Sequence, residues 1–481
     1  MIKKLLLGVV AVAILLVGIL LFNTFRFTSK QLAIETVPSP ELTQESLKHF
    51  QEAISYKTIS YGDSTLFDST QFLGFRSFLE KTYPTIHTKL SREVVVGYSL
   101  LYKWEGKNTD LKPYVLMAHQ DVVPIEEVTR SKWTVDPFVA EIKEGFIWGR
   151  GTTDDKINLI SIFEATEKLL LEGYQPERTI YFAFGHDEEV GGTGAKAIAA
   201  LLKSRNITAD LVMDEGGIIT KKEIPNMTQP VALLGTSEKG YLSLDLTVEK
   251  SGGHSSQPAK ETAIDILASA LLKIRENPFE ASISESTQGF LDYIGPEMPF
   301  LQKIIFANQW LFEALIIGIY EKSPTGNAVM RTTAVPTIID AGIKDNVVPT
   351  IAKATVNFRL LPGDEIKEVT EQVKQKINDE RVKISNANSF LAEASAVTPT
   401  HSFAFKKVNE TIRKTSANTL VAPLLLIGGT DSRHFGEVST GIIKFSPMVD
   451  PIGFHGIDER VSLESYRTAI WFYEQLLEDT K

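Results

Sequence analysis

The sequence has no cysteine among its 481 residues. Disulfide bonds, thiolate zinc sites, iron–sulfur clusters and thiol nucleophiles are therefore all excluded. Any metal ion bound by this protein must be held by histidine, aspartate and glutamate side chains. Histidine is itself scarce, with eight in the whole chain, so the position of each one is informative.

Positive charge is also in short supply. Lysine and arginine together number 50, against 60 aspartates and glutamates, and the formal net charge is −10. Such a chain repels polyphosphates, so nucleic acid is excluded as an expected partner. The hydrophobic content of 43% and the charged content of 23% are typical of a folded protein, and the length predicts two or three domains.

One long apolar run occupies residues 5–22, with Lys3 and Lys4 before it and Arg26 after it. As a helix it nearly spans a hydrocarbon core of roughly 30 Å, and the leading lysines favour a cytoplasmic N-terminus. A cleaved signal peptide is the alternative, although the run exceeds the usual roughly 7–15 apolar residues and no small-x-small cleavage site follows it. Both interpretations place the body outside the cytoplasm (periplasmic, extracellular or lumenal), anchored in the membrane or, after cleavage, secreted.

Residues 1–27 are the anchor or signal, and residues 28–45 form a polar, proline-containing linker. The segments after the linker alternate between strand-like and helix-like patterns. Short apolar runs that end in polar or acidic residues predict strands, and apolar stripes at three-to-four spacing predict helices between them. The expected strands are 114–118, 179–184 and 211–213, and the expected helices are 72–82, 158–172, 193–204 and 461–478. This pattern predicts an α/β fold with a mixed, mostly parallel sheet sandwiched by helices.

The pattern changes between residues 242 and 390. Residues 242–249 and 354–360 alternate apolar with polar side chains, as in half-solvated antiparallel strands. Helical patterns cover residues 261–276 and 366–379, so a two-layer α+β insert is expected here. The first layer, from residue 46 to 241, resumes over residues 391–481.

Residues 304–320 are strongly apolar but include Asn308, Gln309 and Glu313, which makes them too short and too polar for a second membrane span. The simpler interpretation is a buried or interface helix. The alternative is an apolar wall for a hydrophobic substrate or a surface that faces a membrane.

Five places concentrate the residue types that bind metals. They are His119-Gln-Asp121, the glycine-rich turn 149–156 with Asp154 and Asp155, His186-Asp-Glu188-Glu189, Asp214-Glu-Gly-Gly, and the late blocks 428–435 and 454–459 with His455. Most of them follow strand-like runs, and ligands of open α/β sheets lie at the carboxyl ends of strands. Paired carboxylates also allow one group to bind a metal while its neighbour transfers a proton.

Each place has an ordinary explanation when taken alone. His-x-Asp arises by chance, and two acids before a helix are favourable at its N-terminus. In the insert, His254 follows two glycines, and Asn346 and Arg359 lie in strand-rich sequence, where turn and surface roles are common. The joint occurrence of these places is what favours a metal centre.

In this order the blocks resemble the M20 metallopeptidase family, from about residue 45 to the end. Residues 121–124 (Asp-Val-Val-Pro), Trp133, residues 146–151 and residues 428–433 resemble its carboxypeptidase S branch, which includes the N-fatty-acyl-amino-acid synthase/hydrolases. The resemblance implies that residues 46–241 and 391–481 form the catalytic domain. It also implies that residues 242–390 form a lid and homodimerisation domain.

The resemblance also implies a role for individual residues. Asp154 would bridge two Zn²⁺ ions, with His119 and Asp214 completing one site and Glu189 and His455 the other. Asp121 would orient His119, Glu188 would be the general base, and a cis peptide bond would join Asp154 to Asp155. His254, often from the partner subunit in family dimers, would polarise the scissile carbonyl. The residues expected to contact substrate are Asn346, Arg359, Gly429 and Arg433.

The family's motifs are intact, including Glu188, which favours an active amide hydrolase over a noncatalytic receptor or scaffold on the same fold. An arginine suits a bidentate grip on a free carboxylate. Small peptides and N-acyl amino acids both carry such a group, so both substrate classes remain open, and the apolar segment 304–320 leans toward acyl groups.

Overall fold

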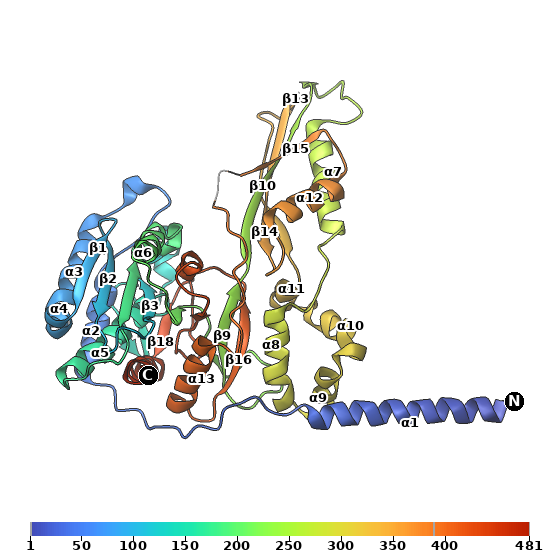
Figure 1. The fold of residues 1–481 in the computed structure, drawn as a ribbon. Coiled ribbons are helices and arrows are strands. Elements are labelled where there is room, and N and C mark those ends of the chain that lie inside the picture. Colours follow the sequence, from blue (N-terminus) through green and yellow to red (C-terminus); the bar gives the residue numbers. More distant parts are fainter. Residues whose placement is uncertain (1, 388–389, 481) are drawn as a thin grey trace.

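A nine-stranded mixed sheet forms the centre of the computed structural model, which describes residues 2–387 and 390–480 (Figure 1). The strand order is β1-β2-β6-β3-β7-β17-β9-β16, with β8 paired to β9. The bounds are β1 Ser91–Val95, β2 Ser99–Trp104, β3 Tyr114–His119, β6 Ile180–Gly185, β7 Leu211–Asp214, β8 Ile219–Thr220, β9 Val231–Glu238, β16 Leu420–Leu426 and β17 Ile442–Lys444. Strands β6, β3, β7 and β17 run parallel, as do β9 and β16.

Helices cover both faces of this sheet. They are α2 Gln44–Ser55, α3 Ser69–Thr82, α4 Pro84–Lys89, α5 Lys156–Leu171, α6 Thr193–Ser204, α13 Phe403–Thr415 and α14 Leu463–Glu478. Along β3, Leu116 joins the core that contains α5 and α14, whereas Val115 and Met117 join the core under α6. This alternation follows from the two-residue period of a strand. The predicted α/β sandwich is confirmed.

A three-stranded sheet, β18-β5-β4, flanks the large sheet. Its strands are β4 Glu141–Lys143, β5 Phe146–Trp148 and β18 Arg460–Ser462. Strand β5 leads directly into the glycine-rich turn at 149–155, and β18 follows the loop that carries His455. Pairing of β5 with β18 therefore brings these two loops together.

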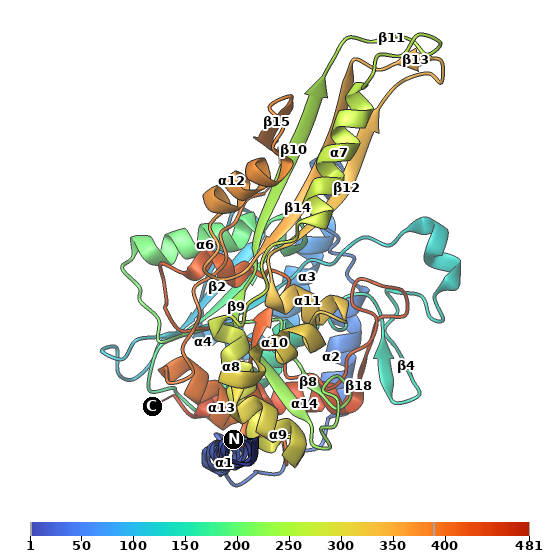
Figure 2. The ribbon, with the colours of Figure 1, turned by 90° about the vertical axis from the view of Figure 1, so that its right-hand side faces the viewer.

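A second, four-stranded antiparallel sheet extends from the large one, as Figure 2 shows. Its order is β12-β14-β10-β15, with β10 Gly240–Glu249, β12 Thr333–Ala341, β14 Ile351–Leu360 and β15 Val382–Asn386, and it packs against α7 Ala263–Glu276 and α12 Ile366–Ile377. At its far end a small two-stranded ribbon pairs β11 Gly253–His254 with β13 Val347–Val348. The alternating segments of the sequence thus form the predicted antiparallel strands, while the exact domain boundaries remain predictions.

Two chain connections join the sheets at one place. Lys239 alone separates β9 from β10, and the returning chain crosses beside it. The Tyr241 backbone N–H donates to the Ala392 carbonyl at 2.7 Å, and the Ala392 N–H donates back at 3.0 Å. A Cβ atom on Gly240 would lie 2.7 Å from the Ala394 nitrogen, so only glycine fits this crossing.

The segment between α7 and β12 forms helices that leave the second sheet. Helices α8 Glu285–Ile294, α9 Phe300–Ala307, α10 Gln309–Tyr320 and α11 Pro324–Met330 follow one another, and α8 packs on β16 of the large sheet. The helix expected over residues 304–320 is broken at Asn308, where α9 and α10 meet at 113°. Only Ile316 of α10 is buried, so the helix is not a buried one, while the interface helix and the substrate-wall or membrane-facing alternative remain predictions.

The N-terminal apolar run forms α1, Ile2–Arg26, which projects away from the body beside α9 (Figure 1). It is long and apolar enough to cross a membrane, and a signal sequence would pass the same test. Residues 28–43 then run along the body without helix or strand.

Candidate metal centre and active site

The carboxyl ends of the parallel strands bring the predicted ligands together. His119 is the last residue of β3 and lies in register with Gly185 of β6, whose following turn carries Glu188 and Glu189. All of these groups therefore project from one edge of the sheet, the usual site of ligand binding in α/β folds.

Asp154 lies between two histidines. Its Oδ1 is 2.8 Å from Nε2 of His119, and its Oδ2 is 2.9 Å from Nε2 of His455. Nε2 of His455 is also 3.2 Å from a carboxylate oxygen of Glu189. One carboxylate contacting two imidazoles on opposite sides is the arrangement that two neighbouring metal ions would share.

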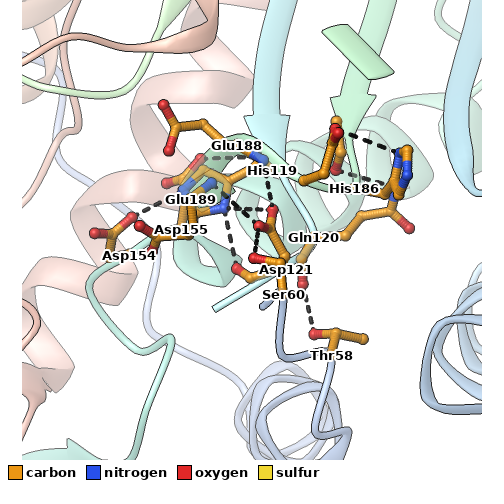
Figure 3. A network of polar contacts seen from close by, with 12 residues as sticks. Thr58, Ser60, His119, Gln120, Asp121, Asp154, Asp155, His186, Glu188 and Glu189 are labelled. Carbon is orange, nitrogen blue, oxygen red and sulfur yellow. Dashed lines mark hydrogen bonds and ion pairs between the residues drawn. The ribbon is translucent and has the colours of Figure 1, made fainter. Parts of the chain in front are cut away.

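Asp121 connects His119 to the loop that follows β6 (Figure 3). Its carboxylate accepts hydrogen bonds from the backbone N–H groups of Glu188 and Glu189 at 3.1 and 3.2 Å, and from Ser60 Oγ at 2.5 Å. It also lies 3.3 Å from Nδ1 of His119. Although burial acts to raise the pKa of Asp121, the contact with His119 holds that pKa below its ordinary value. A contact of this kind is the usual way in which a carboxylate orients a histidine behind a metal.

Asp155 is tied to the same strand end. The Asp154–Asp155 peptide bond is cis, as expected. One carboxylate oxygen of Asp155 accepts the backbone N–H of His119 at 3.3 Å, and the other accepts Asn158 Nδ2 at 2.5 Å.

The side chains of Asp214 and Glu215 face different parts of the site, and Glu215, not the predicted Asp214, faces His119. The Asp214 carboxylate turns to the 428–435 loop, where it accepts the Ser432 backbone N–H at 2.7 Å. The neighbouring Glu215 carboxylate instead lies 3.4 Å from Nε2 of His119. Two groups of potential ligand atoms therefore lie within 4.8 Å of one another. One is His119, Asp154 and Glu189, and the other is His119, Asp155 and Glu215.

The donor set fits divalent metal ions. Burial, and then the nearby Asp431 carboxylate, raises the pKa of Glu188 well above its ordinary value, and burial likewise raises the pKa of Glu215. Oε1 of Glu189 is buried without a hydrogen-bond partner among residues 2–387 and 390–480. Buried acids that oppose one another's ionisation require a cation to remain charged, and imidazole with carboxylate is a donor combination that suits zinc.

Residues 115–479 match the profile described as peptidase family M20/M25/M40. The chain belongs to the M20 family. The predicted membership is therefore confirmed, and the protein is a metal-dependent hydrolase of this family, whose members typically use zinc.

Two curated M20 relatives cover nearly the whole chain. A probable carboxypeptidase S-like 2 from Dictyostelium discoideum is 40% identical over 97% of this chain and 93% of its own length. The N-fatty-acyl-amino acid synthase/hydrolase PM20D1 from Homo sapiens is 38% identical over 89% of this chain and 86% of its own. A solved M20 metallo-carboxypeptidase from Sulfolobus solfataricus has a TM-score of 0.66 at 19% identity, covering 91% of this chain and 99% of that one, and shares the fold.

Of the two arginines predicted to contact substrate, Arg433 lies at the M20 centre and Arg359 lies on β14 of the second sheet. Arg433 Nη1 is 3.7 Å from Oε1 of Glu188, and a Cβ atom on Gly429 would lie 3.2 Å from the same nitrogen. Arg359 stacks on the Tyr241 ring at 4.6 Å, and burial, together with the nearby Arg433, lowers its pKa. Arg433 thus lies beside the proton-transfer candidate, and its charge also acts on Arg359.

The structure does not bring His254 and Asn346 to this centre within one chain. Both lie at the exposed β11–β13 ribbon at the far end of the second sheet, where the Ser255 backbone N–H donates to the Asn346 carbonyl at 3.2 Å (Figure 2). Their predicted roles therefore depend on a second copy of the chain.

Sequence reasoning missed a buried ion pair that holds the metal-centre loops in place. Arg150 Nη1 lies 2.6 Å from Glu459, whose other carboxylate oxygen accepts the backbone N–H groups of Gly151 and Thr153. Arg150 also donates to the His455 and Gly456 carbonyls. Glu459 follows His455 closely in sequence, but an acid at that position carries no sign of its partner 309 residues away.

Replacing Glu459 with alanine is expected to lower the free energy of unfolding by about 3–5 kcal/mol, because Arg150 is left buried and unpaired. Thermal and urea unfolding of the purified chain measure this. Glu93→Ala, which removes an exposed partner of Arg205, is the matched control and should cost less than about 1 kcal/mol. Equal stability of the two variants would contradict the structural role of Glu459.

Proposed function

We propose that this M20 protein is a two-zinc enzyme that hydrolyses the amide bond next to a free carboxylate in N-acyl amino acids. The observation that carries the proposal is the position of Asp154 between two histidines, with Glu188 beside them. A noncatalytic receptor on the same fold remains the alternative, and it gives no reason to keep a buried Glu188 at this position.

We assign His119, Asp154 and Glu215 to one zinc ion, and His455, Asp154 and Glu189 to the other. The assignment replaces Asp214 with Glu215, because the Asp214 carboxylate faces Ser432 and the Glu215 carboxylate faces His119. Zinc ions held there would polarise the substrate carbonyl and lower the pKa of a nearby water.

Replacing Glu215 with glutamine is therefore expected to weaken the binding of the ion it ligates by at least roughly 10- to 100-fold, so that the zinc content falls by about half. Asp214→Asn is the matched control, since it alters a loop contact and should keep both ions. Metal analysis after gel filtration measures the content of each variant. The reverse result, with zinc lost only from Asp214→Asn, would restore the sequence-based assignment.

Glu188 transfers the proton in this proposal. Its raised pKa suits a group that accepts a proton from the attacking water and later donates it to the leaving amine. Asp121 supports the step by holding the Glu188 backbone, and Arg433 lies close enough to influence the Glu188 charge.

Arg433 and Arg359 would bind the free carboxylate of the substrate, which fits the effect of the Arg433 charge on Arg359 and the bidentate geometry of guanidinium. His254 would enter from a second copy of the chain and polarise the scissile carbonyl, which requires a homodimer formed through the second sheet. The exposure of His254 on the β11–β13 ribbon is compatible with that role.

An acyl group is favoured over a peptide by an apolar cavity of about 460 Å³ that is lined by residues of α8, α9, α11 and β16 and by the end of α10. Phe290, Phe306 and Leu424 are among its lining residues, and β16 runs from this cavity to the loop that carries Gly429 and Arg433. A carboxypeptidase acting on short peptides is the second candidate, favoured by the name of the Dictyostelium relative.

The test uses the full chain in detergent, because α1 contacts the body. Zinc-loaded protein is assayed, with and without a chelator, against N-acyl amino acids of rising chain length and against unblocked dipeptides. Chelator-sensitive cleavage that improves with acyl length supports the proposal. Preference for dipeptides supports the carboxypeptidase, and the absence of zinc-dependent turnover on both panels supports the noncatalytic alternative.

For location, we propose that α1 is an uncleaved anchor that leaves the catalytic body outside the cytoplasm. Its apolar length and the two leading lysines support this. The same features fit a signal sequence. The N-terminal sequence of the mature protein distinguishes the two, because it begins within residues 1–27 for an anchor and after them for a cleaved signal.

A further inference from the structure

Helices α9 and α10 form an exposed apolar hairpin on the surface of the body. Leu301 is 76% exposed and Trp310 is 61% exposed, and Phe300, Leu311, Leu315 and Ile319 are also exposed. Between Phe300 and Tyr320 the only ionisable side chains, tyrosine aside, are Lys303 and Glu313. Exposed apolar residues grouped in this way mark an interaction surface.

The exposed apolar residues of α10 form one stripe. Leu311, Leu315 and Ile319 recur at the four-residue spacing that places side chains on one side of a helix, while Trp310 projects about 100° around the helix from Leu311. At 3.6 residues per turn, Glu313 projects roughly 160° around the helix from Leu311 and Leu315. A nonpolar medium could therefore cover the stripe while Glu313 stays in a polar environment.

The hairpin is attached to α1. At the break between α9 and α10, the Asn308 side chain donates to the Leu20 carbonyl at 3.1 Å and accepts from Asn23 Nδ2 at 2.9 Å. The rings of Phe25 and Phe300 lie 6.3 Å apart. These contacts place the hairpin beside the last turns of α1, where a spanning helix would leave the hydrocarbon region (Figure 1).

We propose that α9–α10 is a second membrane contact, which inserts into the leaflet on the side of the catalytic body and does not cross the bilayer. The inference rests on the proposed anchoring by α1 and goes beyond it, because it adds an embedded surface and fixes the body against the membrane. Two short helices meeting at 113° satisfy their own backbone hydrogen bonds, as an interfacial element requires. Trp310 lies two residues after Asn308, which contacts the last turns of α1, and this position matches the preference of tryptophan for the interface.

The first test uses Trp310 as a depth probe in the full chain, reconstituted in phosphatidylcholine vesicles with and without brominated acyl chains. Three of the other four tryptophans, Trp104, Trp148 and Trp471, are buried in the body. Bromine should quench the wild-type emission, and Trp310→Phe should lose most of that quenching. Equal quenching of the two proteins would overturn the inference.

The second test uses the absence of cysteine, since a single introduced cysteine is then the only thiol. In vesicles, Leu315→Cys should resist a water-soluble maleimide, whereas Leu171→Cys, at a position 72% exposed at the end of α5, should react fully. Equal reaction at both positions overturns the inference. Disulfide-linked dimers through Leu315→Cys also overturn it, by assigning the hairpin to a second copy of the chain.

Flotation of the vesicles after an alkaline carbonate wash separates the two proposals. A chain that does not float refutes both the anchor and the hairpin contact. A chain that floats but shows no quenching of Trp310 keeps the anchor and refutes the hairpin contact alone.

Discussion

Glu188→Ala is expected to lower kcat by about 10²–10⁴-fold while leaving zinc content and overall stability close to those of the wild type. The Glu188 side chain lies beside the ligand cluster without joining either group of potential ligand atoms, and its closest ionic contact is Arg433. Its loss therefore removes a proton acceptor and not a metal ligand. Steady-state kinetics together with metal analysis measure both parts of the result.

Glu188→Gln provides the sharper form of this experiment. The amide keeps the shape of the side chain but cannot accept a proton, so glutamine should cost about as much in kcat as alanine. Glu280→Ala, at an exposed position outside the described centre, is the control and should retain full activity. Nearly normal turnover by Glu188→Gln would show that another group transfers the proton.

Asp154→Asn is expected to have the second large effect, because one carboxylate contacts both histidines. An amide offers only one weak ligand atom and no charge, so both zinc ions should be lost together, and activity should fall by at least about 10⁴-fold, to the level of the chelated protein. Metal analysis and turnover in excess zinc measure this result. A variant that loses a single ion would contradict the bridging role of Asp154.

The matched control for this substitution is Asp245→Asn on β10, where a largely buried carboxylate pairs with the exposed Lys353 in the second sheet. It changes the same functional group outside the centre and should alter neither zinc content nor kcat. A comparable loss in the control would mean that amide substitutions damage the protein generally.

The sequence predicted the sheet that positions the centre, because β3, β6 and β7 are short apolar runs with clear polar ends. It did not predict the break at Asn308, which is stabilised by hydrogen bonds to α1, nearly 300 residues away in sequence. The packing of α8 on β16 is likewise a tertiary contact that local periodicity does not reveal.

At the centre, the order of the motifs was enough to locate His119, Asp154, Glu189 and His455 as one cluster. It could not separate Asp214 from Glu215, since β7 ends between them and the chain then turns through Gly216 at a φ of +131°. Which of two adjacent side chains faces a neighbour depends on that turn, and a residue pattern does not specify its dihedral angles. Ser60 and Glu459 also went unassigned, because their partners are distant in sequence.

The joint at Lys239 and Gly240 makes the second sheet a lever. The ten residues of β10 span about 34 Å from this joint toward the β11–β13 ribbon. A rotation of about 10° at the joint therefore displaces the far end by about 6 Å, which is more than the reach of a hydrogen bond. Since Lys239 is buried and donates to the Ala328 and Arg331 carbonyls, the pivot is braced by two backbone contacts. A small change in these two contacts would therefore displace His254, at the far end of the second sheet, more than it displaces residues near Lys239.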